Sequence, residues 1–418
     1  MRRDRPFHRD GSGVLACLHV HLVIYEVPTL GPEEQGALWR IERVQRELRY
    51  YVAEQKRWVG SMRRILSALA IQGSNGIEGY NVSVEDVIAA IEGDSPTEAS
   101  EEDWKAVSGY RRAMTYVLQL ARDDHFEFSP SLIRSLHFMM TEYSLDAGPG
   151  LWRPGAIWIT NDKTKKVVYE GPDSEMVPGL VEELVKQFVE SPDVPVQVLA
   201  AMAHLNLAMI HPFRDGNGQM ARCLQTLALA RAGILVPEFC SIEEFLGANT
   251  DDFYALLGEV GQGAWNPHHD ARPWIRFCLT AHFVQTTSVL RRVQESEQVW
   301  NALEAMVTDR RVPLRSVAAL FDATLGLRIR NASYRSILEG WVEGISNQVA
   351  TNDLRAMVDA GLLEQMGNKR GTYYVAAEPL RELHRQHLHG RQEIDSSDLF
   401  TPPPDPNGPI EPTLPFGQ

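Results

Sequence analysis

The stretch His211–Arg222 constrains the possible fold and chemistry of this chain more than any other part of the sequence. The residues before it, Val198–Ile210, are apolar at helical spacing and predict a buried helix. Apolar residues resume the helical period from Met220, so a second helix is expected to begin near Gly218. The stretch therefore forms a loop that leads into a helix N-terminus, where glycines and free N–H groups favour a phosphate.

Three side chains in this stretch add chemistry to the anion site. His211 can accept a proton near neutral pH, and Asp215 offers a hard oxygen ligand for Mg²⁺. Arg222 lies on the second helix and can grip an outer phosphate. A base, a metal ligand and a phosphate-binding loop so close together indicate phosphoryl or nucleotidyl transfer. The alternative is a glycine-bearing turn between two core helices, with Asp215 as a helix cap.

The same stretch resembles the motif of Fic (Fido) proteins, H-x-F-x-D/E-G-N-G-R-x-x-R, and departs from it at Gln219 alone. The resemblance implies a protein adenylyltransferase, which moves AMP from ATP to a hydroxyl of a target protein with Mg²⁺. His211 would be the catalytic base, Asp215 the metal ligand, and Phe213 the anchor of the loop in the core. The implied nucleotide-binding residues are Gly216, Asn217, Gly218, Gln219 and Arg222.

Gln219 stands where the family usually carries Arg. Its amide can donate a hydrogen bond to a phosphate but brings no charge, and charge-assisted hydrogen bonds are about twice as strong. The affinity for a triphosphate and the choice of nucleotide are therefore open. The same site could reverse AMPylation, or use UTP, GTP or a phosphocholine nucleotide as the donor. A non-catalytic alternative is a nucleotide sensor that regulates a DNA-binding module.

Upstream, Ser74-x-x-x-Glu78-Gly79 resembles the S/T-x-x-x-E-G/N motif of Fic proteins that carry an autoinhibitory helix. Ser74 and Glu78 are four residues apart, so a helix places both on one face. Gly79 suits the left-handed residue that ends such a helix. The resemblance implies that Glu78 pairs with Arg222 and blocks productive placement of the terminal phosphate.

Two β-like runs, Ala156–Thr160 and Lys166–Tyr169, flank a polar turn and predict a hairpin. The hairpin resembles the Fic flap, which follows the family's G-x-x-R stretch, here Gly150–Arg153, and pairs with a target protein by strand addition. A hairpin that only packs is the alternative. Tyr254 resembles a family tyrosine near the nucleotide base, although ordinary core packing explains it equally well. The expected edge residues of the flap are Ile157, Trp158 and Ile159.

Residues 345–375 indicate a capped helix followed by a β-wing, and they resemble the winged-helix module often fused after Fic cores. Winged helices can place a helix in the DNA major groove. This stretch carries three acidic and three basic residues, however, so it lacks the electrostatic footprint of a DNA reader. DNA binding and protein binding, including homodimer formation, are equally expected. The DNA contacts would be Asn347, Gln348, Asn352, Arg355, Lys369 and Arg370.

The fold class expected for the whole chain is mainly α, with a Fic-type helical core, a small β-hairpin flap and a winged helix-turn-helix domain. The ends are polar or Pro-rich, and we expect them to be disordered. The expected ranges are 1–31 for a disordered extension, 32–92 for N-terminal helices with the inhibitory motif, 93–290 for the catalytic core, 296–376 for the winged helix and 390–418 for the disordered Pro-rich tail.

Composition argues against broad binding to nucleic acids or anionic membranes, because 41 basic and 55 acidic residues give a formal net charge of −14. No apolar run approaches membrane-spanning length. The four cysteines are far apart, which is typical of core thiols in a reducing compartment. We therefore expect a cytoplasmic protein that does not contact membranes.

Overall fold

The computed structural model describes residues 22–53, 56–93, 95–96, 98–160, 166–233, 239, 241–339, 344–368, 371–388 and 393–402. Several expectations concern residues outside these ranges. They include the first 21 residues of the expected N-terminal extension, the last residues of the Pro-rich tail, and Lys369 and Arg370 as DNA contacts.

The chain begins with a pair of helices followed by a short one. α1 (Pro32–Ala53) and α2 (Val59–Ile77) are separate helices, and α3 (Val84–Glu92) follows the inhibitory motif. Ser83 caps α3, because its hydroxyl accepts a hydrogen bond from the Asp86 backbone N–H at 3.1 Å. The short helix therefore begins with a serine N-cap.

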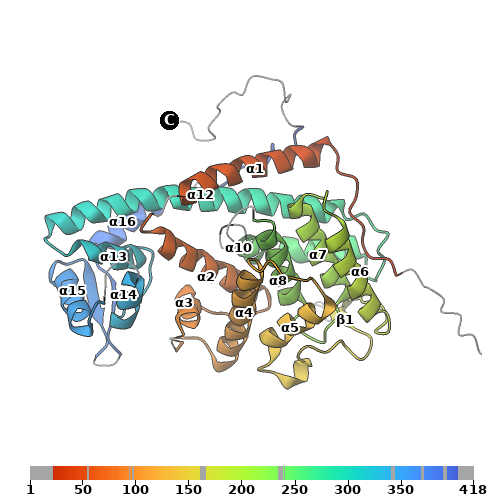
Figure 1. Ribbon diagram of the computed structural model, residues 1–418, viewed down its shortest axis with the longest axis horizontal. Helices are drawn as coiled ribbons and strands as arrows, with labels where there is room; N and C mark the ends of the chain where they lie inside the picture. Colours follow the sequence, from red (N-terminus) through yellow and green to blue (C-terminus); the bar gives the residue numbers. More distant parts are fainter. Residues whose placement is uncertain are drawn as a thin grey trace, which may run out of the picture.

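Two helices form the centre of the core and carry the motif between them. Nearly every residue of α7 (Val196–Ile210) and α8 (Asn217–Arg231) is buried, so both helices are surrounded by protein on all sides. Figure 1 shows this pair with the neighbouring helices packed around it. The surrounding helices are α4 (Glu101–Leu120), α5 (Pro130–Thr141), α6 (Val177–Glu190), α10 (Glu243–Ala248) and α11 (Thr250–Gly261).

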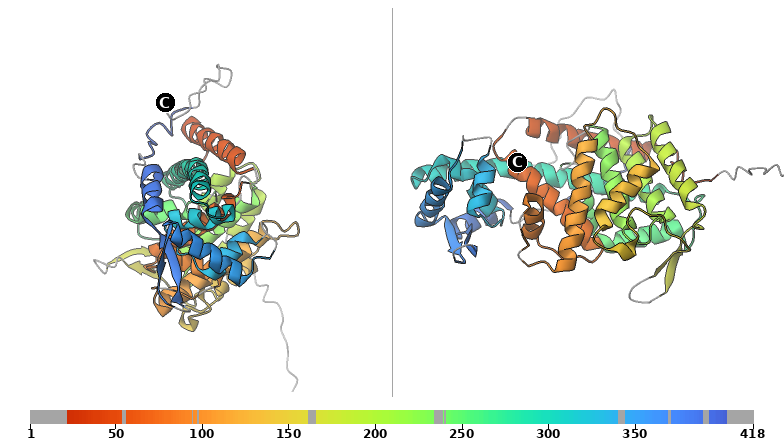
Figure 2. Two further views of the ribbon diagram at one scale, coloured as in Figure 1. Left: turned by 90° about the vertical axis from the view of Figure 1, so that its left-hand side faces the viewer. Right: turned by 60° about the horizontal axis from the view of Figure 1, so that its bottom comes forward.

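The predicted hairpin is present. β1 (Trp158–Thr160) pairs antiparallel with β2 (Val167–Glu170), with Ile159 opposite Tyr169. The end of β2 is tied to the core, since the Glu170 N–H donates to Gly263 O at 3.0 Å. The two strands project from the helical body (Figure 2).

A single long helix, α12 (Arg272–Asp309), runs the length of the molecule (Figure 1). The sequence predicts a break between two domains at residues 290–296, but α12 crosses these residues as one continuous helix. The domain ranges themselves stay predictions. Val289, Val293 and Val299 are all buried in one apolar cluster, so packing continues through the expected linker.

Beyond α12, a helical unit with a hairpin packs at one end of the molecule; we call residues 314–388 the C-terminal module (Figure 1). Its β3 (Leu363–Met366) and β4 (Tyr373–Ala376) form the expected antiparallel hairpin after α15. Assignment of this unit to the winged-helix class, and DNA binding by it, stay predictions. Its helices are α13 (Val317–Thr324), α14 (Asn331–Leu338), α15 (Asn347–Asp359) and α16 (Glu378–Leu388).

The prediction of disorder is wrong for residues 22–31. Tyr25 is fully buried, and its N–H donates to Asn206 Oδ1 at 2.8 Å while its carbonyl accepts from Asn206 Nδ2 at 3.0 Å. Burial raises the pKa of the Tyr25 hydroxyl to about 12. An aromatic anchor with paired backbone groups offsets the entropy of ordering a short segment.

The prediction of disorder is also wrong for residues 393–402. Leu399 is only 1% exposed, and Phe400 lies under the Arg276 guanidinium of α12 at 5.2 Å. Arg40 of α1 donates to the carbonyls of Leu399 and Thr401, at 3.3 and 2.9 Å. Two apolar residues within a polar tail thus dock between α1 and α12. The polar average composition of the tail does not reveal this contact.

In the part of the chain that the structure describes, no helix is long and apolar enough to cross a membrane.

We expect Leu399→Ala to detach the C-terminal segment without unfolding the core. Because the lost side-chain burial removes much of what holds the segment, amide hydrogen exchange at residues 396–401 should rise about tenfold. Mass spectrometry of exchange, with the half-exposed Leu314→Ala as a matched control, measures this effect. Unchanged exchange in the Leu399 variant would show that the Arg40 hydrogen bonds and the Phe400 contact hold the segment without Leu399.

Candidate active site

The predicted helix–loop–helix is confirmed by backbone geometry. α7 ends at His211, which adopts a left-handed conformation with φ +50°, and α8 starts after Gly216, with φ +74°. Glycine reaches such a conformation without a steric penalty, whereas His211 is strained there. Residues 211–216 are thus a tight loop that directs the N-terminal turn of α8 outward.

Asn217 and Phe213 close this loop from inside. The Asn217 side chain accepts from the Phe213 N–H at 2.9 Å and donates to the Phe213 carbonyl at 3.0 Å. Phe213 itself is fully buried, as an anchor should be. Asn217 was expected among the nucleotide-binding residues, but its side chain is committed to the loop, so only its backbone is positioned to meet a ligand.

His137 of α5 supports the loop from the other side, and the sequence analysis missed it. Its ring stacks on Phe213 at 3.7 Å with an interplanar angle of 2°. Its Nδ1 accepts from the Gly150 N–H at 2.9 Å, so the proton is on Nε2, which donates to the Asp215 carbonyl at 2.9 Å. Burial lowers the pKa of His137 and keeps it neutral. The sequence signal that could have pointed to His137 is its position four residues after Ile133, on the same buried face of α5.

Arg153 joins the loop to the segment that leads into the flap. The buried guanidinium donates to the His211 carbonyl at 2.9 Å and to the Gly155 carbonyl at 2.6 Å, and it also bonds the Pro172 carbonyl. The Arg153 N–H donates to the Pro212 carbonyl at 2.9 Å. The arginine of the G-x-x-R stretch thus organises backbone carbonyls on both sides of the flap.

The tautomer of His211 makes Nε2 the basic atom. Nδ1 lies 3.1 Å from the Ala208 carbonyl, which can only accept, so Nδ1 carries the proton. Burial lowers the pKa of His211 to about 4, and the nearby Arg153 charge adds to the effect. At neutral pH the imidazole is therefore uncharged, with a lone pair on Nε2.

Asp215 is exposed at the loop tip, and one of its carboxylate oxygens accepts from the Gly216 N–H at 2.7 Å. Among the described residues, no three His, Cys, Asp or Glu side chains come together as a metal cage. A single carboxylate fits Mg²⁺, which usually keeps several waters and takes its other ligands from substrate phosphates.

The N-terminal turn of α8 faces a carboxylate of α2. A Cβ added at Gly218 would overlap Glu78 Oε1, so the Glu78 carboxylate lies directly against the expected anion site. Helix N-termini favour negative charge, and Glu78 supplies it here. Gly79 ends the motif with φ +88°, the left-handed conformation that was predicted.

Arg222 is buried and joins α8 to the inhibitory segment. It donates to Ser74 Oγ at 2.7 Å, to the Ser74 carbonyl at 3.0 Å and to Glu78 Oε1 at 2.6 Å. Burial alone would lower the pKa of Arg222, but Glu78 and Tyr110 raise it. Within the described part of the chain, Nη1 of Arg222 has no hydrogen-bond partner. The pairing expected between Glu78 and Arg222 is therefore present; its inhibitory role stays a prediction.

Gln219 lies against α2 and does not point to solvent. It is 4% exposed, and its amide nitrogen donates to Asn75 Oδ1 at 3.0 Å. Asn75 in turn donates to the Ile71 carbonyl at 2.8 Å, which orients its oxygen. The phosphate contact expected of Gln219 requires this hydrogen bond to break, and Asn75 is a further residue that the sequence analysis missed.

The remaining predicted residues line the same region. The Tyr254 ring is half exposed, and its hydroxyl donates to the Ile77 carbonyl at 3.4 Å, so it contacts the end of α2. On the flap, Trp158 is 54% exposed, whereas Ile157 and Ile159 are half-buried. The flap is joined to His211 through Arg153, as described above.

Comparison with known proteins agrees with this geometry. The sequence model of the Fic/DOC family matches residues 127–229, which run from α5 to α8. Protein adenylyltransferase Fic of Nematostella vectensis is 27% identical over 223 residues, which cover 50% of this chain and 45% of that protein. Protein adenylyltransferase fic-1 of Caenorhabditis elegans is 31% identical over 116 residues, 26% of this chain and 20% of that protein. The chain thus spans less than half the length of these curated relatives.

Solved structures share the fold. A Fic family protein from Desulfovibrio desulfuricans G20 superposes with a TM-score of 0.54 at 21% identity, over 85% of this chain and 99% of that one. A Fic domain containing signaling protein from Bacteroides thetaiotaomicron gives a TM-score of 0.50 at 19% identity, over 61% of this chain and 97% of that one. The chain therefore contains a Fic/DOC domain, and its mainly helical core has the Fic fold.

Proposed function

We propose that this chain is a Mg²⁺-dependent protein adenylyltransferase, which transfers AMP from ATP to a hydroxyl side chain of a target protein. The observation that carries the proposal is the neutral His211, with its lone pair on Nε2, six residues before Asn217, where a helix starts whose N-terminal turn suits a phosphate. The Fic/DOC domain and the names of the relatives, protein adenylyltransferases, support it.

The reaction needs one proton transfer and one displacement. His211 Nε2 takes the proton of the target hydroxyl while the hydroxyl oxygen attacks the α-phosphorus of ATP. The bond from the α-phosphorus to the bridging oxygen breaks, and pyrophosphate leaves with that oxygen. The backbone N–H groups at the start of α8 stabilise the charge that develops on the phosphate oxygens. Mg²⁺ held by Asp215 would neutralise negative charge on the nucleotide phosphates.

The target protein would add a strand to the flap. β1 pairs with β2 on one side. The exposed Trp158 and the half-buried Ile159 lie on β1, close to the Arg153 contacts that hold His211. Main-chain pairing along β1 would hold the target hydroxyl near His211 Nε2, with side-chain contacts to Trp158 adding specificity.

The described conformation would be the inhibited one. Glu78 occupies the space above Gly218 and pairs with Arg222, where the terminal phosphate is expected. Because two anions cannot share one N-terminal turn, bound ATP and the Glu78 carboxylate compete. The Asn75–Gln219 hydrogen bond holds the same helix in place.

We predict that Glu78→Gly raises AMP transfer about tenfold or more, since it removes the competing carboxylate. Mass spectrometry of the purified variant with ATP and Mg²⁺ detects the AMP adduct on the protein or on added targets. His211→Ala in the Glu78→Gly background is the control, and loss of the base should lower transfer by about 100-fold or more.

Other outcomes of this experiment are equally informative. An adduct that survives His211→Ala would exclude His211 as the base. If no adduct forms with ATP but one forms with UTP, GTP or a phosphocholine nucleotide, that nucleotide is the donor. If the protein instead releases AMP from an AMPylated target, the site catalyses the reverse reaction. Nucleotide binding without any covalent product would favour the sensor of a DNA-binding module.

The pH dependence follows from the lowered pKa of His211. The base must be neutral, so activity is present above its pKa and is lost as pH falls through about 4. We expect the transfer rate of Glu78→Gly protein to stay constant between about pH 8 and about pH 5. A half-maximal rate near the ordinary histidine value of about 6.5 would contradict this account of the buried imidazole.

Gln219→Ala distinguishes two roles of this side chain. If the Asn75 contact holds the inhibited state, its loss should raise transfer by about twofold to tenfold, the value of one neutral hydrogen bond. If Gln219 instead binds a phosphate, the substitution should lower transfer. Transfer by the otherwise wild-type chain is measured beside Gln386→Ala, a glutamine of the exposed face of α16.

A further inference from the structure

α2 belongs to two parts of the molecule at once. Trp58, Met62 and Leu66, at its N-terminal end, are buried in the same apolar cluster as Leu320 and Phe321 of the C-terminal module. The C-terminal end of α2 carries the inhibitory segment 74–79, which contacts α8 as described above. One helix therefore links the packing of the C-terminal module to the blocked anion site.

An ion pair fixes the N-terminal half of α2 to the module. Arg64 bonds the carboxylate of Asp322 on α13, and it also lies 3.5 Å from Glu92 Oε1 at the end of α3. The Asp322 side chain is 3% exposed and that of Arg64 18% exposed. A carboxylate so buried depends on its partner, because an unpaired charge in the interior is strongly destabilising.

The helix between the two contacts can transmit a shift. Arg64 and Glu78 are fourteen residues apart on one helix, which corresponds to about 21 Å along the axis. Continuous backbone hydrogen bonds make such a segment stiff. At Gly73 a Cβ would overlap the Glu243 carbonyl, so α2 packs closely against α10 with no side chain between them.

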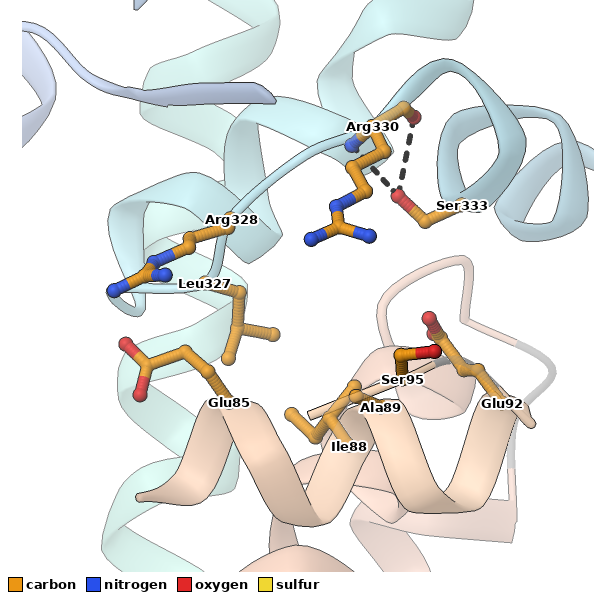
Figure 3. A pocket seen from close by; sticks show the side chains of 9 residues that line it. All are labelled: Glu85, Ile88, Ala89, Glu92, Ser95, Leu327, Arg328, Arg330 and Ser333. Atoms are coloured by element: carbon orange, nitrogen blue, oxygen red, sulfur yellow. Dashed lines mark hydrogen bonds between the residues drawn. The ribbon is translucent and has the colours of Figure 1, made fainter. Parts of the chain in front are cut away.

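The seam on the α3 side of the module is less tightly filled. A cavity of about 50 Å³ lies there between α3 and the segment that enters α14. Figure 3 shows Ile88 and Ala89 of α3 facing Leu327 and Arg330 of the module across this space. The ion pair Arg328–Glu98, at 3.0 Å, bridges the seam nearby. The module is thus joined to the rest of the chain through α2 and α12, and its contact with α3 leaves this small space unfilled.

We propose that α2 couples the C-terminal module to the active site, so that a displacement of the module that breaks Arg64–Asp322 withdraws Glu78 from Arg222. A partner that binds the module would then relieve inhibition from a distance, whatever its chemistry. The meaning of this displacement as activation rests on the proposed adenylyltransferase function. The mechanical coupling itself does not.

The test compares two arginines in the full chain. Arg64→Met breaks the pair with Asp322, whereas Arg315→Met breaks a similar pair with buried Asp353 inside the module, at 2.6 Å. Hydrogen exchange of residues 74–80 is followed by mass spectrometry, and the affinity for ATP with Mg²⁺ by titration. Coupling predicts that Arg64→Met raises both the exchange of residues 74–80 and the affinity for ATP about fivefold or more. Arg315→Met should change exchange only within residues 314–388.

Unchanged exchange of residues 74–80 in Arg64→Met, or an equal rise in Arg315→Met, would overturn the coupling. If Arg64→Met does not fold, Asp322→Asn keeps a polar partner for Arg64 and should give a smaller change in the same direction; no change would again reject the proposal. Hydrogen exchange needs neither nucleotide nor catalysis. Raised exchange without any AMP adduct would therefore refute only the proposed function, and an adduct without raised exchange only the coupling.

Discussion

The buried guanidinium of Arg222 is the charge around which this structure is arranged. A cation taken out of water needs anionic partners, and Glu78 comes from α2 while the buried Glu243 lies nearby under hydrogen bonds from Tyr110 and Thr226. Burial raises the pKa of Glu243 and the neighbouring Arg222 opposes that effect. The same requirement draws the segment 74–79 onto the expected anion site, so that stability of the core and the proposed inhibition share one interaction.

The loop 211–216 is held by two groups that are distant in sequence and by the neighbouring Asn217. His137 supports the loop under Asp215, Arg153 holds the His211 carbonyl, and Asn217 closes the turn from within. Each fixes backbone, which leaves His211 Nε2 and the N-terminal turn of α8 for the substrate. Pre-organised donors and a fixed base require no rearrangement at the moment of reaction. The strained conformation of His211 is maintained because these contacts over-determine it.

Regular patterns in the sequence predicted the helices well, together with the hairpin and the loop between α7 and α8. They failed where a few contacts outweigh local composition. The segment around Leu399 is polar on average, and the apolar segment around Tyr25 follows a polar stretch, yet one or two buried side chains hold each of them. No helix break occurs at residues 290–296 because Leu290, Val293 and Ser296 form a buried face of α12 at helical spacing.

The sequence by itself determined which chemical groups lie close together: a histidine, an aspartate, glycines at a helix start and an upstream glutamate, all within short motifs whose spacing fixes their local geometry. Only the tertiary structure decided the state of these groups. The hydrogen bond from Arg153 to the His211 carbonyl, the partner of Gln219, the position of Glu78 over Gly218 and the attachment of α2 to Asp322 all join residues brought together by packing. Burial and competition for one anion site depend on distances through space, which spacing along the chain does not encode.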